Sequence, residues 1–177
     1  MALTNEDLES IIPWLADCSG NPLKFVEEGF DWGIGELAEY DGPDEWQIAI
    51  LAAVREGLLT VDEAIQIAVA SGHGIGKSAL VAWLILWALA TMEDTKGVVT
   101  ANTENQLKTK TWAELAKWHR LFIAKDLFQY TATAIFSTDP NHEKTWRIDM
   151  VPWSERNTEA FAGLHNQGKR VLLVFDE

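Results

Sequence analysis

In the second part of the chain, apolar segments of strand length alternate with segments that have the apolar spacing of a helix. This order predicts a parallel α/β sheet. The expected strands are 65–70, 97–101 and 171–176, and the expected helices are 77–92 and 103–125. Strands that alternate with helices form parallel sheets with right-handed crossovers. Two more strand-like runs, 130–136 and 145–151, flank a turn-rich segment and predict a hairpin. We therefore expect an α/β fold with a mainly parallel sheet that is flanked by helices.

The first 60 residues follow another pattern, that of short acidic helices interrupted by proline and glycine. A first helix is expected to begin at Thr4 or Asn5, and we expect Pro13 to interrupt the helical pattern that follows. We expect residues 1–60 to form a helical lid subdomain, and residues 61–177 to form the core.

The expected helix 103–125 has an apolar stripe on one face and basic residues on the others. The stripe consists of Leu107, Thr111, Leu115, Trp118 and Phe122. The basic residues are Lys108, Lys110, Lys117, Arg120 and Lys125. Two interpretations of these basic residues stay open, a plain solvated face and a weak surface for DNA.

Charge and composition limit the possible partners. The chain has 177 residues, 47% hydrophobic composition and a formal net charge of −13. Residues 1–95 carry a net charge of −14, which repels nucleic acid, so any contact with DNA should be transient. The longest apolar stretch, 79–90, is too short to span a bilayer, and no basic-apolar signal begins the chain, so we expect a cytoplasmic protein. The single Cys18 has no partner for an internal disulfide.

The segment 71–78 has the composition of a phosphate-binding loop between a strand and a helix. Its residues are Ser71, Gly72, His73, Gly74, Ile75, Gly76, Lys77 and Ser78. Glycines let successive backbone N–H groups turn toward an anion, and the helix that follows adds the positive end of its dipole. Lys77 can then reach the β- and γ-phosphates, and Ser78 can ligate Mg²⁺. Ser71 stands where the usual pattern has glycine, but the sequence still predicts a site for ATP.

The end of the chain supplies two carboxylates after an apolar run. The run 171–175 is hydrophobic throughout, as in a strand that is buried on both faces, and Asp176 and Glu177 follow it. Functional groups of open α/β sheets lie at the carboxyl ends of strands. We expect Asp176 to face Mg²⁺ and Glu177 to act as the catalytic base that polarises water. A base next to the metal ligand favours a hydrolase over a kinase, which has to exclude water.

In this order and spacing, several segments over roughly residues 40–177 resemble the ATPase domain of the large terminase subunit of tailed bacteriophages. The resemblance rests on Trp46-Gln47, the 71–78 loop, 99–106, 161–165 and 171–177. It implies a P-loop NTPase of the RecA-like, or ASCE, type that hydrolyses ATP to move double-stranded DNA into a procapsid. By the same resemblance Trp46 and Gln47 bind adenine. The implied partners are DNA, the small terminase subunit and the portal protein, in a homo-oligomeric ring.

The chain departs from the family pattern in two places. Many members have an arginine where His73 stands, and an imidazole is a weaker cation that depends on pH. The family also continues past the Asp-Glu pair, so the resemblance implies that this chain is truncated. A catalytic arginine supplied to a neighbouring subunit is expected at Arg156, in preference to Lys169 and Arg170. Two alternatives stay open, a RecA-like helicase ATPase and a nucleotide-binding fragment without turnover.

Overall fold

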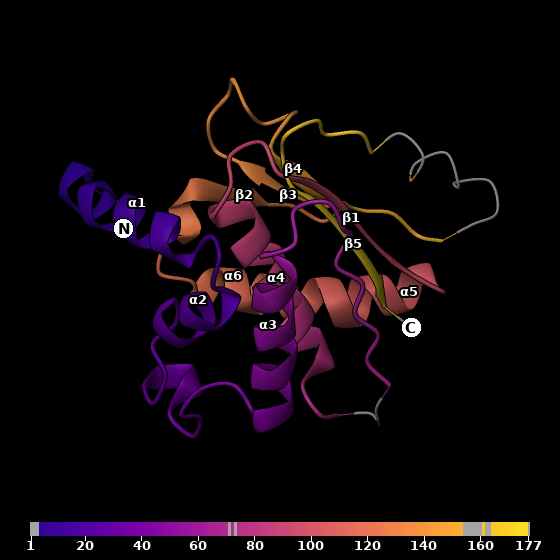
Figure 1. Cartoon of the computed structure of the whole chain (residues 1–177). Helices are drawn as coiled ribbons and strands as arrows, with labels where there is room; N and C mark the ends of the chain where they lie inside the picture. Colours follow the sequence, from indigo (N-terminus) through magenta and orange to yellow (C-terminus); the bar gives the residue numbers. More distant parts are fainter. Residues whose placement is uncertain (1–3, 71, 73, 154–160, 162–163, 177) are drawn as a thin grey trace.

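A five-stranded sheet with helices gathered on one side of it makes up the fold (Figure 1). The structure is a computed structural model that describes residues 4–70, 72, 74–153, 161 and 164–176. The strands are β1 (Lys96–Ala101), β2 (Phe128–Tyr130), β3 (Ala134–Ser137), β4 (Arg147–Met150) and β5 (Val171–Asp176). The α-helices are α1 (Asn5–Cys18), α2 (Pro22–Glu28), α3 (Glu45–Gly57), α4 (Lys77–Ala90), α5 (Glu104–Gln106) and α6 (Ala113–Leu121). The other helical segments are η1 (Gly35–Leu37), η2 (Leu107–Trp112) and η3 (Lys125–Leu127).

The strand order is β2-β3-β4-β1-β5, and the sheet is mixed. Strand β1 pairs in parallel with both β4 and β5, whereas β3 pairs antiparallel with both β2 and β4. The predicted hairpin is confirmed as β3 and β4, with Ile135 opposite Ile148. The expected strand 130–136 is divided, since residues 131–133 form no strand and Tyr130 ends β2. The α/β class is therefore confirmed. The expectation of a mainly parallel sheet was too simple, because the hairpin and β2 add an antiparallel half.

The strand expected at 65–70 is absent, since residues 64–70 form no strand. Ile65, Ile67 and Val69 have the alternation of a strand, yet their exposed fractions are 39%, 39% and 37%. In Figure 1 this segment follows the purple end of α3 as a coil. Alternation indicates an extended chain but does not supply a partner strand, and an extended chain becomes a strand only by pairing.

Strand β5 is paired as expected but is not buried on both faces. It lies at one end of the sheet, with β1 as its neighbour among the described strands. Leu172 and Val174 pack against the core, while Leu173 and Phe175 on the other face are exposed. A continuous apolar run predicts two covered faces. Here α1 to α6 lie on the side of Leu172 and Val174, and Leu173 and Phe175 on the other face stay exposed.

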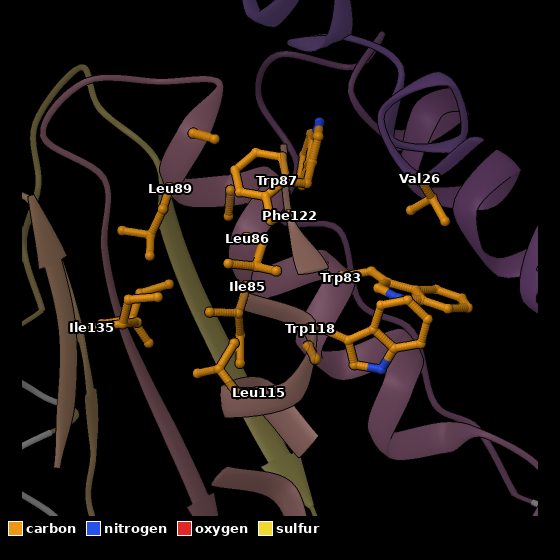
Figure 2. Packing of buried hydrophobic residues seen from close by; sticks show 14 of the residues in the cluster. Val26, Trp83, Ile85, Leu86, Trp87, Leu89, Leu115, Trp118, Phe122 and Ile135 are labelled. Atoms are coloured by element: carbon orange, nitrogen blue, oxygen red, sulfur yellow. The ribbon is translucent and has the colours of Figure 1, made fainter. Parts of the chain in front are cut away.

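Helix α4 is the centre of the hydrophobic core. Its residues from Ala79 to Ala90 are almost all buried, and it packs against α2, α6, β4 and β5. Figure 2 shows Ile85 and Leu86 of α4 close to Leu115 of α6, and Leu89 toward Ile135 of β3. The helix therefore has a sheet on one side and helices on the other.

The N-terminal helices pack onto the same core as α4. Phe25, Val26 and Leu51 are fully buried in the cluster that also contains the α4 residues. Thr4 caps α1 in a capping box with Asp7, which confirms the predicted start. Pro13 lies inside α1 and does not interrupt it, contrary to expectation. The boundary at residue 60 stays a prediction.

The expected helix 103–125 forms as α5, η2 and α6 and ends at Leu121, four residues earlier than expected, because the backbone of Phe122 is extended. All five residues of its apolar stripe are buried. Its middle segment, η2, is a π-helix. The stripe begins with two steps of four residues, from 107 to 111 and from 111 to 115. In an α-helix a step of four residues passes a full turn by about 40°. A wider π-turn keeps the stripe on one face.

Several basic residues of this helical segment are paired with carboxylates. Lys108 pairs with Glu104, Lys117 with Glu114, and Arg120 with Glu36. These pairs are exposed and add little stability. They neutralise much of the positive charge and so favour the solvated-face interpretation.

Among the described residues, no helix combines the length and the apolar character needed to cross a membrane.

Cys18 is fully buried at the end of α1, and burial raises the pKa of its thiol to about 11. The thiol is thereby kept protonated and unreactive.

His142 joins the β3–β4 turn to the α4–β1 turn. Its Nδ1 lies 2.8 Å from Oδ1 of Asp94, and the hydroxyl of Thr145 donates to the same oxygen. The hydrogen bond to Asp94 raises the pKa of His142 above its usual value of 6.5, and the carboxylates of Asp94, Glu93 and Asp139 act in the same direction. The contact with His142 lowers the pKa of Asp94.

We expect His142→Asn to change the pH dependence of stability. Because the folded state raises the pKa of His142, its contribution is complete below pH 6.5 and is lost as pH rises through the folded-state pKa. The thermal midpoint of the parent should exceed that of the variant most at about pH 6, and the difference should shrink toward about pH 9. The exposed His165, changed to asparagine, is the control. A difference that does not vary with pH would contradict the assignment.

Candidate nucleotide-binding site

The glycine-rich segment leads directly into the N-terminus of α4. Gly74 has φ +77° and Gly76 has φ +87°, in the left-handed region that favours glycine. Gly76 is the N-cap residue, and Lys77 and Ser78 are the first two residues of the helix. The first backbone N–H groups of a helix have no partner within it, so they point outward and attract anions.

Gln47 connects α3 to this loop. It is only 3% exposed, and its Nε2 donates to the carbonyl oxygen of Gly76 at 3.0 Å. Its Oε1 accepts from the backbone N–H of Asp44 at 2.7 Å, in a capping box that begins α3. A Cβ atom added at Gly76 would lie 2.8 Å from Nε2 of Gln47. Two segments that the sequence singled out separately are thus in direct contact.

This contact limits how Gln47 can meet a base. Its oxygen accepts from Asp44 and one of its two N–H donors serves Gly76, so within the hydrogen bonds of the described residues the second N–H and the second lone pair of the oxygen are left for another partner. Trp46 is half-buried and packs against the hydrophobic core. In this arrangement Gln47 supports the loop, and its role toward adenine stays a prediction.

Asp176 lies at the carboxyl end of β5, opposite Ala101 at the end of β1. Its Oδ2 accepts a hydrogen bond from the hydroxyl of Thr111, on η2. In the described part of the chain no hydrogen bond joins Asp176 to Ser78, and the role of the pair as metal ligands stays a prediction. A small cavity of about 50 Å³ lies at this edge of the sheet. It is lined by Thr100, Ala101, Asn102, Trp153, Phe175 and Asp176.

Four predicted site residues lie outside the described residues: Ser71, His73, Arg156 and Glu177. Of the described ones, Gly72, Gly74 and Ile75 are exposed, and Gly76, Lys77 and Ser78 are half-buried. The sequence did not predict the contacts of Thr111 with Asp176 and of Asp44 with Gln47. A threonine inside an apolar stripe was the available signal for the first, and the Asp-x-x-Gln spacing of a capping box for the second.

Arg170 serves the fold. Its guanidinium donates to the carbonyl oxygens of Ala88 and Ser19 and lies 4.1 Å from the centre of the Trp87 ring. Burial lowers the pKa of Arg170 to about 10. An arginine that holds the ends of α1 and α4 together is engaged and not directed toward a neighbouring subunit.

The exposed face of β5 carries an aromatic cluster. Phe161 stacks on Phe175 with ring centres 5.8 Å apart, and Trp153 packs against both rings. Phe161 begins the 161–165 segment of the sequence resemblance. The structure therefore places the start of that segment beside β5.

A second group of possible metal ligands lies near the amino end of β1, away from Asp176 at the carboxyl end of β5. One donor atom each from Glu93, Asp94 and His142 lie within 4.8 Å of one another. Both ring nitrogens of His142 already face carboxylates, with Nε2 3.5 Å from Glu93. The arrangement is that of an ion-paired histidine.

A comparison with models of protein families gave no match, and comparisons with curated proteins and with solved structures gave none either.

We expect Gly76→Ala to destabilise the protein more than Gly74→Ala. Both substitutions place a side chain at positive φ, which costs about 1–3 kcal/mol. At Gly74 no atom lies within 4 Å of the added Cβ, whereas at Gly76 it would also displace Gln47. Urea denaturation measures the free energy of unfolding of both variants. Equal losses would show that Gln47 does not support the loop.

Proposed function

We propose that this protein binds ATP with Mg²⁺ and hydrolyses it, as the ATPase part of a DNA-packaging motor of the terminase type. One observation carries the proposal. The glycine-rich loop runs into the N-terminus of a buried helix, and Gln47 from a separate helix holds the junction at Gly76. A chance glycine turn needs no such support.

The residues at the junction suit a triphosphate. The N-terminal amides of α4 bind phosphate oxygens, and the Lys77 ammonium neutralises their charge. The Ser78 hydroxyl and the Asp176 carboxylate are oxygen ligands of the kind that Mg²⁺ prefers. Bound Mg²⁺ would neutralise charge that develops on the phosphates. Glu177, which follows Asp176, is proposed to orient and deprotonate the attacking water.

The charge of the chain bears on the partners. Net charge is −13, and Lys108, Lys117 and Arg120 are paired with carboxylates. Any DNA contact by these residues is weak and sensitive to salt. The roles of the small terminase subunit, the portal protein and a homo-oligomeric ring, and a cytoplasmic site of action, rest on the sequence resemblance.

Lys77→Ala should weaken ATP binding about 10- to 100-fold, the value of a lost charge-assisted hydrogen bond. A fluorescent ATP analogue titrated against the folded protein measures the affinity. Lys144→Ala is the charge-matched control, because Lys144 is exposed in the β3–β4 turn. Parent-like affinity of the Lys77 variant would refute the phosphate site.

Gln47→Ala should lower the ratio of ATP affinity to GTP affinity about two- to tenfold, the value of one hydrogen bond to the base. Competition of each nucleotide against the fluorescent analogue gives the ratio. Gln129→Ala, on the edge strand β2, is the control. If both affinities fall equally, Gln47 supports the loop alone and does not read adenine.

A further inference from the structure

Thr111 is the one hydroxyl in an otherwise apolar buried stripe. It is 1% exposed, between the fully buried Leu107 and Leu115 on the same helical face. A hydroxyl buried without a partner costs roughly 1–3 kcal/mol, so its partner matters for the fold. Valine would fill the same space without that requirement.

The partner of Thr111 is Asp176. The hydroxyl donates to Oδ2 of Asp176, across 65 positions of sequence, from η2 to the end of β5. Threonine in a helix often donates instead to the carbonyl four residues earlier. Thr109, two residues away and exposed, does so, with its hydroxyl 2.7 Å from the oxygen of Asn105.

The π-helix aims Thr111 at the sheet. Residues 107–112 have the wider turn, and it keeps Thr111 in register with the buried stripe instead of letting it rotate away. Single π-turns inside helices occur often at functional sites. The π-helix therefore keeps the hydroxyl of Thr111 in the position from which it donates to the Asp176 carboxylate.

We infer that Thr111 is a positioning residue that fixes the Asp176 carboxylate for Mg²⁺, which rests on the function proposed above. A carboxylate has two oxygens, and Oδ2 of Asp176 accepts one hydrogen bond from the hydroxyl of Thr111. That bond fixes the rotation of the group and leaves Oδ1 to act as the metal ligand at the carboxyl edge of β1 and β5. Thr111 itself touches neither metal nor nucleotide.

The test compares Thr111→Val, Thr111→Ser and Thr109→Val in the full chain. Each variant and the parent are titrated with Mg²⁺ in the presence of the fluorescent ATP analogue, and binding is also measured in EDTA. We expect Thr111→Val to raise the Mg²⁺ concentration at half-effect about tenfold, as for a lost hydrogen bond to a charged group, with unchanged binding in EDTA. Thr111→Ser should restore the parent curve, and Thr109→Val should match it.

The outcomes separate the two proposals. If the parent binds the analogue with Mg²⁺ and Thr111→Val gives the parent curve, the positioning role is wrong and ATP binding stands. If the parent does not bind the analogue, the proposed function fails and this inference with it. If circular dichroism shows that Thr111→Val is unfolded, the Mg²⁺ titration of Thr111→Ser tests the positioning role instead. The serine keeps the hydroxyl and must retain the Mg²⁺ response, and a loss of that response would overturn the inference.

Discussion

Helix α4 is apolar around its whole circumference, so other elements have to cover it on every side. The sheet covers one side through Leu172 and Val174 of β5, and α2 and α6 cover the other. Trp83 lies where α4 packs against α6, with its ring centre 5.0 Å from that of Trp118. Because α4 cannot tilt or turn without exposing apolar surface, its N-terminus is held in a fixed position. The glycine-rich loop, at that N-terminus, is positioned by the core.

Two polar contacts connect this packed core to the residues of the proposed nucleotide site. Gln47 joins α3 to the loop at Gly76, and Thr111 joins η2 to Asp176. Each joins the buried side chain of a helical residue to a residue at the edge of the core. A buried polar group whose partner is lost costs more than the bond itself contributes, so both contacts resist small displacements. The arrangement gives the loop and the carboxylate separate supports.

The parts of the fold that depend on local pattern were predictable from the sequence. Periodicity located α4, β1 and the hairpin, and it identified the buried stripe that contains Thr111. The failures concern relations between distant segments. Residues 65–69 alternate like a strand but pair with no strand among the described residues. Strand β5 is uniformly apolar, yet its Leu173 and Phe175 are exposed. Neither property is encoded within the segment.

In the candidate site, too, local features were predictable from the sequence and contacts between distant segments were not. Glycine spacing predicted the loop and its junction with α4, because positive φ and a helix start are local properties. That Gln47 would reach Gly76, and Thr111 reach Asp176, follows only from how helices pack. Trp46 was expected at a base and packs against the core, where an indole ring buries a large apolar area.

Amide hydrogen exchange with and without Mg-ATP measures whether the loop before α4 binds the phosphates of ATP, as we propose. Binding should slow exchange in the peptide that spans Gly74 to Ser78, where the amides bind the anion, and in the peptide that contains Gln47. The peptide that spans β3 should not change. Unchanged exchange at 74–78 under saturating nucleotide would contradict the claim.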